Sequence, residues 1–210
     1  ISNIGYIGVG RYQSKQPCGI LHTEEYSVWS GILDRVYSEK FRFRKYADVY
    51  AGCSVAKEWH NFQNFAKWYC SQPNYGRGYQ LDKDLLFPGN REYSEKNCVL
   101  VPQEVNKLFV GSIKRGNQRK TPVGVHMCKS SGKYKASVSM GELDNHGKEK
   151  TTHLGYFTTM EEAFLAYKEA KEVRVKEVAQ RFKETLDERV YNNLMGYDMK
   201  FSLKGEIYAQ

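Results

Sequence analysis

The sequence predicts an α+β protein. A helical N-terminal region ends in a small strand-and-helix unit, and a three-stranded antiparallel sheet packed on one long helix follows it. Three observations in the 210-residue chain lead to this prediction. Apolar and aromatic residues recur at helical spacing between residues 24 and 70. Three apolar-alternating runs between 123 and 157 precede a long helical pattern. Residues 111–121, which are basic and lack apolar periodicity, separate the two parts.

Two amphipathic helices are expected in the N-terminal region, over residues 24–38 and from about Val55 to Cys70. Each carries an aromatic stripe along one side, formed by Tyr26, Trp29, Ile32, Leu33, Val36 and Tyr37 in the first and by Trp59, Phe62, Phe65, Trp68 and Tyr69 in the second. Such stripes usually form a core, so we expect them to be buried. Docking of these helices on a host protein is the alternative reading.

A compact unit is expected over residues 79–109. It comprises a strand at Tyr79–Leu86, a turn at 88–90, a strand near Val99–Val101 and a helix from Pro102. The expected domain organisation is therefore a first domain over 1–110, a basic linker over 111–121, a sheet-and-helix domain over 122–185, and a tail over 186–210 with one short helix.

The second domain has three expected strands, Val123–Met127, Tyr134–Met140 and His153–Phe157. Two overlapping capping boxes, Thr158-x-x-Glu161 and Thr159-x-x-Glu162, predict the start of the helix but do not decide which of the two residues caps it. Its inward stripe should consist of Met160, Ala163, Phe164, Tyr167, Ala170, Val175, Val178 and Phe182.

The period of two in these strands sorts their side chains onto two faces. Tyr134, Ala136 and Val138 should pack on the helix. A polar, positive face should point to solvent, formed by Lys133, Lys135, Ser137 and Ser139 with His126, Cys128, Thr151 and His153 from the neighbouring strands. Such a face suits a DNA major groove, because Lys meets phosphate or guanine while Ser, Thr and neutral His bond to base edges.

The distribution of charge agrees with a polyanion-binding surface. The net charge is +8, and residues 107–150 hold ten Lys and Arg against three Asp and Glu, a local net charge of +7. A merely solubilising surface is the alternative on charge alone. Further expected DNA contacts are Lys129 in the first turn and the linker cations Lys114, Arg115, Arg119 and Lys120.

The stretches G-V-H-x(5)-G-K-Y-K-A-S-V-S and H-L-G-Y-F-x-T-x-E-E-A-F-x-A-Y resemble the plant ethylene-response-factor (APETALA-type) DNA-binding domain, which also occurs in phage endonucleases. The resemblance covers about 122–172. It implies double-stranded DNA as the partner, and its groove-reading positions fall on His126, Lys133, Ser137, Ser139, Thr151 and His153. Several of these are Arg or Trp in the plant proteins, so no sequence preference is carried over.

A second resemblance precedes the linker. Several short stretches between residues 81 and 106 resemble the ββα-metal core of phage HNH endonucleases. They are Leu81-Asp82-Lys83-Asp84, Gly89-Asn90, Tyr93–Cys98, Val101-Pro102 and Asn106. The resemblance implies that Asp82 and Asn106 hold one divalent ion against the scissile phosphate, and that Asn97 orients the base. Oxygen ligands of this kind suit Mg²⁺ or another divalent cation rather than zinc.

This sequence departs from that pattern at the base, where Lys83 replaces His. A free Lys has a pKa near 10.4, so lowering it by about three to reach half neutrality at pH 7 costs roughly 4 kcal/mol. Otherwise Lys83 stays a cation that stabilises the phosphate or the leaving group, or that binds DNA. In its place Asp84 could accept the proton of the attacking water. Two functions follow: an HNH-type endonuclease or nickase of homing type aimed by the sheet, or a catalytically inactive DNA-binding regulator or host-defence antagonist on the same scaffold.

Composition limits the remaining classes. No run approaches 18 apolar residues, so no membrane partner is expected. The N-terminus lacks a charged segment followed by an apolar one, and the five cysteines form no C-x-x-C pair. We therefore expect a cytoplasmic protein (host cytoplasm if phage-encoded) with buried free thiols and no zinc.

Overall fold

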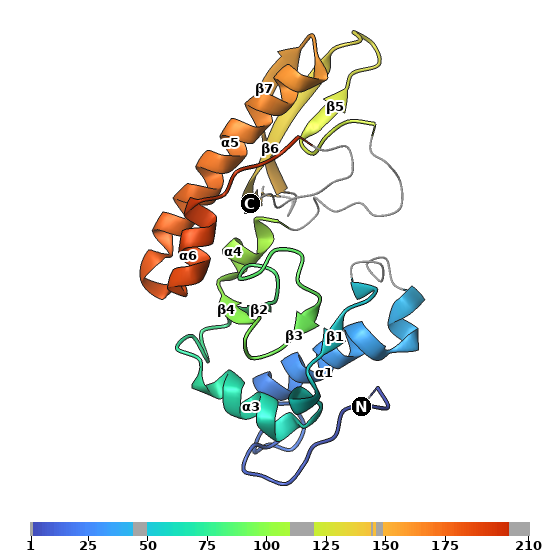
Figure 1. Cartoon of the computed structure of the whole chain (residues 1–210), viewed down its shortest axis with the longest axis vertical. Helices are drawn as coiled ribbons and strands as arrows, with labels where there is room; N and C mark the ends of the chain where they lie inside the picture. Colours follow the sequence, from blue (N-terminus) through green and yellow to red (C-terminus); the bar gives the residue numbers. More distant parts are fainter. Residues whose placement is uncertain (1, 44–49, 110–119, 144, 146–148, 202–210) are drawn as a thin grey trace. The chain divides into compact units, whose positions relative to one another are not determined.

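The structure is a computed structural model that describes residues 2–43, 50–109, 120–143, 145 and 149–201 (Figure 1). It divides into two compact units, Ile1–Val101 (unit 1) and Pro102–Gln210 (unit 2). Helices and strands occur in both, so the predicted α+β class is confirmed.

Unit 1 is built around two helices. α1 (Glu24–Tyr37) begins at Thr23, whose side chain accepts a hydrogen bond from the Tyr26 amide, and α3 spans Phe62–Ser71. The 3₁₀ helices η1 (Glu39–Phe43) and η2 (Lys57–His60) follow α1 and precede α3. The aromatic stripes form one buried cluster, as predicted, which includes Trp29, Ile32, Leu33, Trp59, Phe62, Phe65, Trp68 and Tyr69. The aromatic faces of both helices are therefore largely taken up by the core of unit 1, with Tyr26, Val36 and Tyr37 partly exposed at its edge.

The second predicted helix was placed to begin too early. Residues 54–55 are extended, and α3 begins only after Asn61, whose side chain accepts from the Gln63 amide. The indole of Trp29 donates to the carbonyl of Trp59 over 2.6 Å. This hydrogen bond holds Trp59, which lies in η2, in the core although the helix α3 begins only later. Tertiary contacts thus override the helical periodicity between 55 and 61.

Four short strands form two ladders in unit 1. β1 (Ser54–Val55) pairs in parallel with β3 (Glu92–Tyr93), and β2 (Gln80–Asp82) pairs antiparallel with β4 (Val99–Val101). The predicted strand Tyr79–Leu86 is wrong beyond Asp82, because the Asp82 carboxylate accepts hydrogen bonds from the amides of Asp84 and Leu85 and turns the chain there.

Unit 2 begins with the short helix α4 (Gln103–Lys107). Glu104 forms ion pairs with Arg174 at 2.6 Å and Arg181 at 2.8 Å, which tie α4 to the long helix of unit 2. The division therefore falls before the linker expected at 111–121, most of which lies outside the described residues.

The rest of unit 2 is a three-stranded antiparallel sheet with a long helix on one face (Figure 1). Its strands are β5 (Val125–Met127), β6 (Tyr134–Leu143) and β7 (Glu149–Phe157), in that order, with β6 in the middle. α5 (Met160–Arg181) begins at the second predicted capping box, where Thr159 and Glu162 exchange hydrogen bonds. η3 (Lys183–Thr185) and α6 (Glu188–Met195) follow, so the short helix expected in the tail is present.

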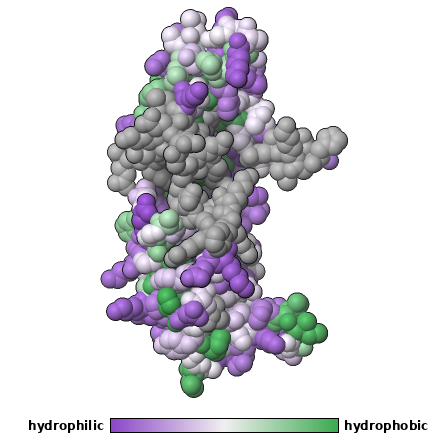
Figure 2. Space-filling model, turned by 90° about the vertical axis from the view of Figure 1, so that its right-hand side faces the viewer, coloured by the Kyte–Doolittle hydropathy of each residue, from purple (hydrophilic) through white to green (hydrophobic). Residues whose placement is uncertain are grey.

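The cysteines depart in part from expectation. All five are free thiols, but only Cys98 is buried, while Cys18 is exposed. Among the described residues, no helix is both long and apolar enough to cross a membrane. Most of the described surface visible in Figure 2 is hydrophilic, and its hydrophobic areas are small and separate.

Candidate nucleic-acid interface and candidate metal site

The two faces of the sheet in unit 2 differ sharply in chemistry. Ala136, Val138 and Val125 are at most 3% exposed, and with the buried residues Ala163, Phe164, Tyr167, Val175 and Val178 of α5 they form the core of the unit. Most of the predicted inward set is therefore buried, while Tyr134, Met160, Ala170 and Phe182 are only half-buried. The residues between these inward positions form the opposite face.

This opposite face, called the outer face below, consists of aligned polar rows. Register pairs His126 with Lys135, Lys135 with Tyr156, Ser137 with His153, and Ser139 with Thr151. His126, Thr151, His153 and Tyr156 are exposed, while the residues of the middle strand are half-buried between their neighbours. The structure thus brings together the predicted residues His126, Lys135, Ser137, Ser139, Thr151 and His153 on one face.

Tyr156 is the outer-face residue that the sequence analysis missed. The register of β6 with β7 shifts between Ala136 and Ser137, so that Gly155 faces Ala136 while His153 faces Ser137. This bulge changes the phase of the strand and places Tyr156, 54% exposed, beside Lys135. The rings of Tyr156 and His153 pack edge to face at 4.9 Å. The glycine at position 155 was the sequence signal for this bulge, since a glycine inside a strand often marks one. Its φ in the structure is +136°.

The remaining predicted cations lie at one end of the sheet or in the linker. Lys129 and Lys133 are exposed in the turn between β5 and β6, and Lys120 is exposed before β5. The linker residues Lys114, Arg115 and Arg119 lie outside the described residues. In the same turn, hydrogen bonds from the hydroxyls of Ser130 and Ser131 lower the pKa of Cys128 to about 7.

The predicted catalytic residues of unit 1 form a tight network centred on Lys83. Lys83 is 7% exposed, and its ammonium donates to Oδ1 of Asp84 over 2.6 Å and to the carbonyl of Asn90 over 2.8 Å. It also lies 5.9 Å from the centre of the Tyr93 ring. The nitrogen thus donates to two acceptors inside the protein.

Asn90 connects this network to Asn97. The amide of Asn90 donates to the carbonyls of Lys83 and Glu92, and its oxygen accepts from Nδ2 of Asn97 over 3.1 Å. Asn97 also donates to Glu92 over 3.3 Å. Asn97 therefore contacts Asn90 and Glu92 beside Lys83, and its expected role of orienting a base stays a prediction.

The residues expected to hold a metal do not form a site within unit 1. One oxygen of Asp82 accepts two backbone hydrogen bonds, each 2.7 Å long, and burial raises the pKa of this carboxyl. The neighbouring carboxylate of Asp84 is held by Lys83. The second expected ligand, Asn106, lies on α4 in unit 2. Among the described residues, no three His, Cys, Asp or Glu side chains are grouped as metal ligands. In unit 1, the carboxylates of Asp82 and Asp84 are therefore already engaged by backbone amides and by Lys83.

No family model matches this chain, and neither curated proteins nor solved structures show a significant similarity to it.

Proposed function

We propose that this protein binds double-stranded DNA through the outer face of the β5–β6–β7 sheet. The observation that carries the proposal is the segregation of the two faces: aliphatic residues are buried under α5, while the outer face carries cationic, hydroxyl, imidazole and phenol groups in aligned rows. A surface that combines a lysine with hydroxyl, imidazole and phenol groups offers partners for both phosphates and polar base edges.

The dimensions of the sheet favour a groove as the binding position. Neighbouring strands lie about 4.8 Å apart, so three strands span roughly 10 Å between their outer axes. The major groove of B-DNA is about 12 Å wide, which exceeds this distance between the axes of the outer strands. The helix α5 covers the other face of the sheet and therefore does not cover the outer face (Figure 1).

Each kind of side chain on the outer face has a distinct use in this proposal. Lys135, with Lys133 in the turn at the end of the sheet, binds phosphates or guanine edges, and the hydroxyls of Ser137 and Ser139 bond to base edges. The ring of Tyr156 supplies an apolar surface of the kind that contacts the thymine methyl group.

Salt dependence tests the proposal directly. We expect the logarithm of the association constant for a labelled random duplex to fall steeply with the logarithm of salt concentration, because bound counterions are released. Changing Lys133→Gln and Lys135→Gln together should weaken binding and reduce the slope by up to about 2, roughly 0.9 for each lost phosphate contact. Fluorescence anisotropy at several salt concentrations measures both quantities.

The matched control is Lys176→Gln with Lys183→Gln, which removes the same charge from exposed positions on α5 and η3. A wild-type affinity that does not respond to salt, or an equal loss in the control variant, would contradict the proposal.

We further propose that the protein acts by binding DNA and not by cutting it. The support is the Lys83 network, in which the ammonium is bound by Asp84 and Asn90. A regulator or host-defence antagonist on an HNH-like scaffold is the function that this arrangement favours. Metal-dependent cleavage of the HNH type stays a prediction of the resemblance.

A plasmid assay separates binding from cutting. We expect purified protein with Mg²⁺ or Mn²⁺ to leave supercoiled plasmid intact under conditions in which it binds the plasmid. Asp82→Asn is the informative variant, because its amide oxygen can still accept the two backbone hydrogen bonds. Nicking by the wild type that this variant abolishes would establish a nuclease and refute this second proposal.

A further inference from the structure

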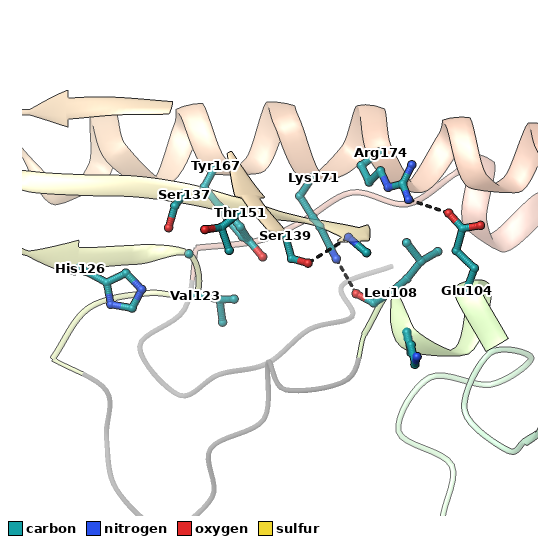
Figure 3. Close-up of a pocket in the computed structure, with 13 residues that line it drawn as sticks. Glu104, Leu108, Val123, His126, Ser137, Ser139, Thr151, Tyr167, Lys171 and Arg174 are labelled. Atoms are coloured by element: carbon teal, nitrogen blue, oxygen red, sulfur yellow. Dashed lines mark hydrogen bonds and ion pairs between the residues drawn. The ribbon is translucent and has the colours of Figure 1, made fainter. Parts of the chain in front are cut away.

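Unit 2 contains a pocket of about 290 Å³ that shares residues with the outer face (Figure 3). His126, Ser137, Ser139 and Thr151 contribute to it from the sheet. Tyr167, Lys171 and Arg174 contribute from α5, and Glu104, Lys107 and Leu108 contribute from α4 and its end. Since a water molecule takes up about 30 Å³ in the liquid, the pocket has room for a phosphate group with part of a sugar.

The position of the pocket follows from the short first strand. β5 pairs with β6 only from Tyr134 to Ala136, and the Gly124 carbonyl then accepts from the Ser137 amide. Beyond that point, none of the described strands covers this side of β6. Side chains of the outer face and of α5, which lie on opposite faces of the sheet, can meet only around such an open edge.

The lining of the pocket is cationic and rich in hydroxyl groups. It holds three cations, Lys107, Lys171 and Arg174, and one carboxylate, Glu104, which already pairs with Arg174 and Arg181. The hydroxyls of Ser137, Ser139 and Thr151 are added donors. This is the composition of an anion site, and it combines charge with several hydrogen-bond donors.

Arg174 gives an independent indication that the pocket accepts an anion. It is 9% exposed and donates through Nη2 to Glu104, but its buried Nε has no hydrogen-bond partner among the described residues. A buried donor without a partner is costly and calls for an explanation such as an ion at that place.

We propose that this pocket binds a phosphoryl group. The inference rests in part on the proposed function, because a duplex on the outer face would bring a backbone phosphate to the open edge beside Ser139 and Thr151. A free phosphorylated ligand, such as a mononucleotide, offers the same chemistry, and the test separates the two sources.

The test uses the full chain and inorganic phosphate as the probe. At constant ionic strength, millimolar phosphate should shift the amide resonances of Gly141 and Ser139 saturably in nitrogen–proton correlation spectra. Lys107→Gln should raise the dissociation constant for phosphate about tenfold, because a charge-assisted hydrogen bond is lost. Lys107 is exposed, so the change should not unfold the protein. Lys176→Gln, exposed on α5 and outside the pocket, is the matched control.

Competition with DNA identifies the source of the phosphoryl group. If phosphate displaces a random duplex at constant ionic strength and Lys107→Gln weakens duplex binding, the pocket takes a phosphate of the DNA backbone. If phosphate and duplex bind at the same time, the pocket binds a free phosphorylated ligand. If the protein binds phosphate but no duplex, the pocket proposal still holds for a free ligand, and only the proposed DNA-binding function is refuted. No saturable shift in the wild type, or equal weakening in Lys107→Gln and Lys176→Gln, overturns the pocket proposal.

Discussion

The surroundings of single side chains decide their chemistry in this protein, as two cysteines illustrate. Cys128 lies in the turn between β5 and β6, with its sulfur 3.2 Å from the hydroxyl of Ser130. Hydrogen bonds from Ser130 and then Ser131 stabilise the thiolate and lower the pKa of Cys128 to about 7 from an ordinary 9.0. Burial has the opposite effect on Cys98 and raises the pKa of its thiol.

Alkylation with iodoacetamide should therefore distinguish the two thiols. The rate at Cys128 should rise with pH as the thiolate forms and reach half its maximum near pH 7, while buried Cys98 should stay unmodified in the native protein. Peptide mass spectrometry after short exposures measures both rates. Ser130→Ala should move the midpoint to higher pH; a wild-type midpoint at the ordinary value of a free thiol would contradict this account.

At the scale of elements, two glycines control how the sheet of unit 2 is built. Gly155 accommodates the bulge that turns Tyr156 outward. Gly124 precedes β5 with a φ of +78°, and a Cβ there would lie 2.0 Å from the ring of Tyr167. The close approach of this backbone to α5 is what allows Val125 to enter the core.

Gly124→Ala should consequently destabilise unit 2. We expect the free energy of unfolding to fall by about 2–4 kcal/mol, because left-handed strain and steric overlap add together. Urea unfolding followed by far-UV circular dichroism measures the change. Gly132→Ala is the control: φ is +67° but nothing lies within 4 Å of the added carbon, so only about 1 kcal/mol should be lost. Equal losses in the two variants would rule out the contact with Tyr167 as the cause.

For the whole molecule, the division into two units separates the proposed binding surface from the Lys83 network. The outer face, its covering helix and the phosphoryl pocket all belong to unit 2, which has its own core. The Lys83 network and all three tryptophans belong to unit 1.

A fragment of residues 102–210 should therefore fold and bind DNA by itself. Its circular dichroism spectrum should show a helix-and-sheet fold that unfolds cooperatively, and its salt slope for a random duplex should match that of the full chain. Anisotropy measurements with both proteins provide the comparison. A folded fragment with no affinity for the duplex would show that unit 1 is required for binding.

The sequence by itself determined the features that depend on neighbours along the chain. The alternation in β6 predicted the burial of Ala136 and Val138, the two overlapping capping boxes placed the start of α5 to within one residue, and the aromatic spacing identified the core of unit 1. Strand and helix periods are local properties of the backbone, so such patterns can be read directly.

Only the tertiary structure decided the features that depend on contacts between segments. Pairing with β6 produced the bulge that exposes Tyr156, chain folding placed the side chain of Lys83 against Asp84 and the carbonyl of Asn90, and the open edge of the sheet joined residues of α4, β6 and α5 in one pocket. The physical reason is the same in each case: hydrogen bonds and charges act through space, and their partners are set by how the chain folds back on itself.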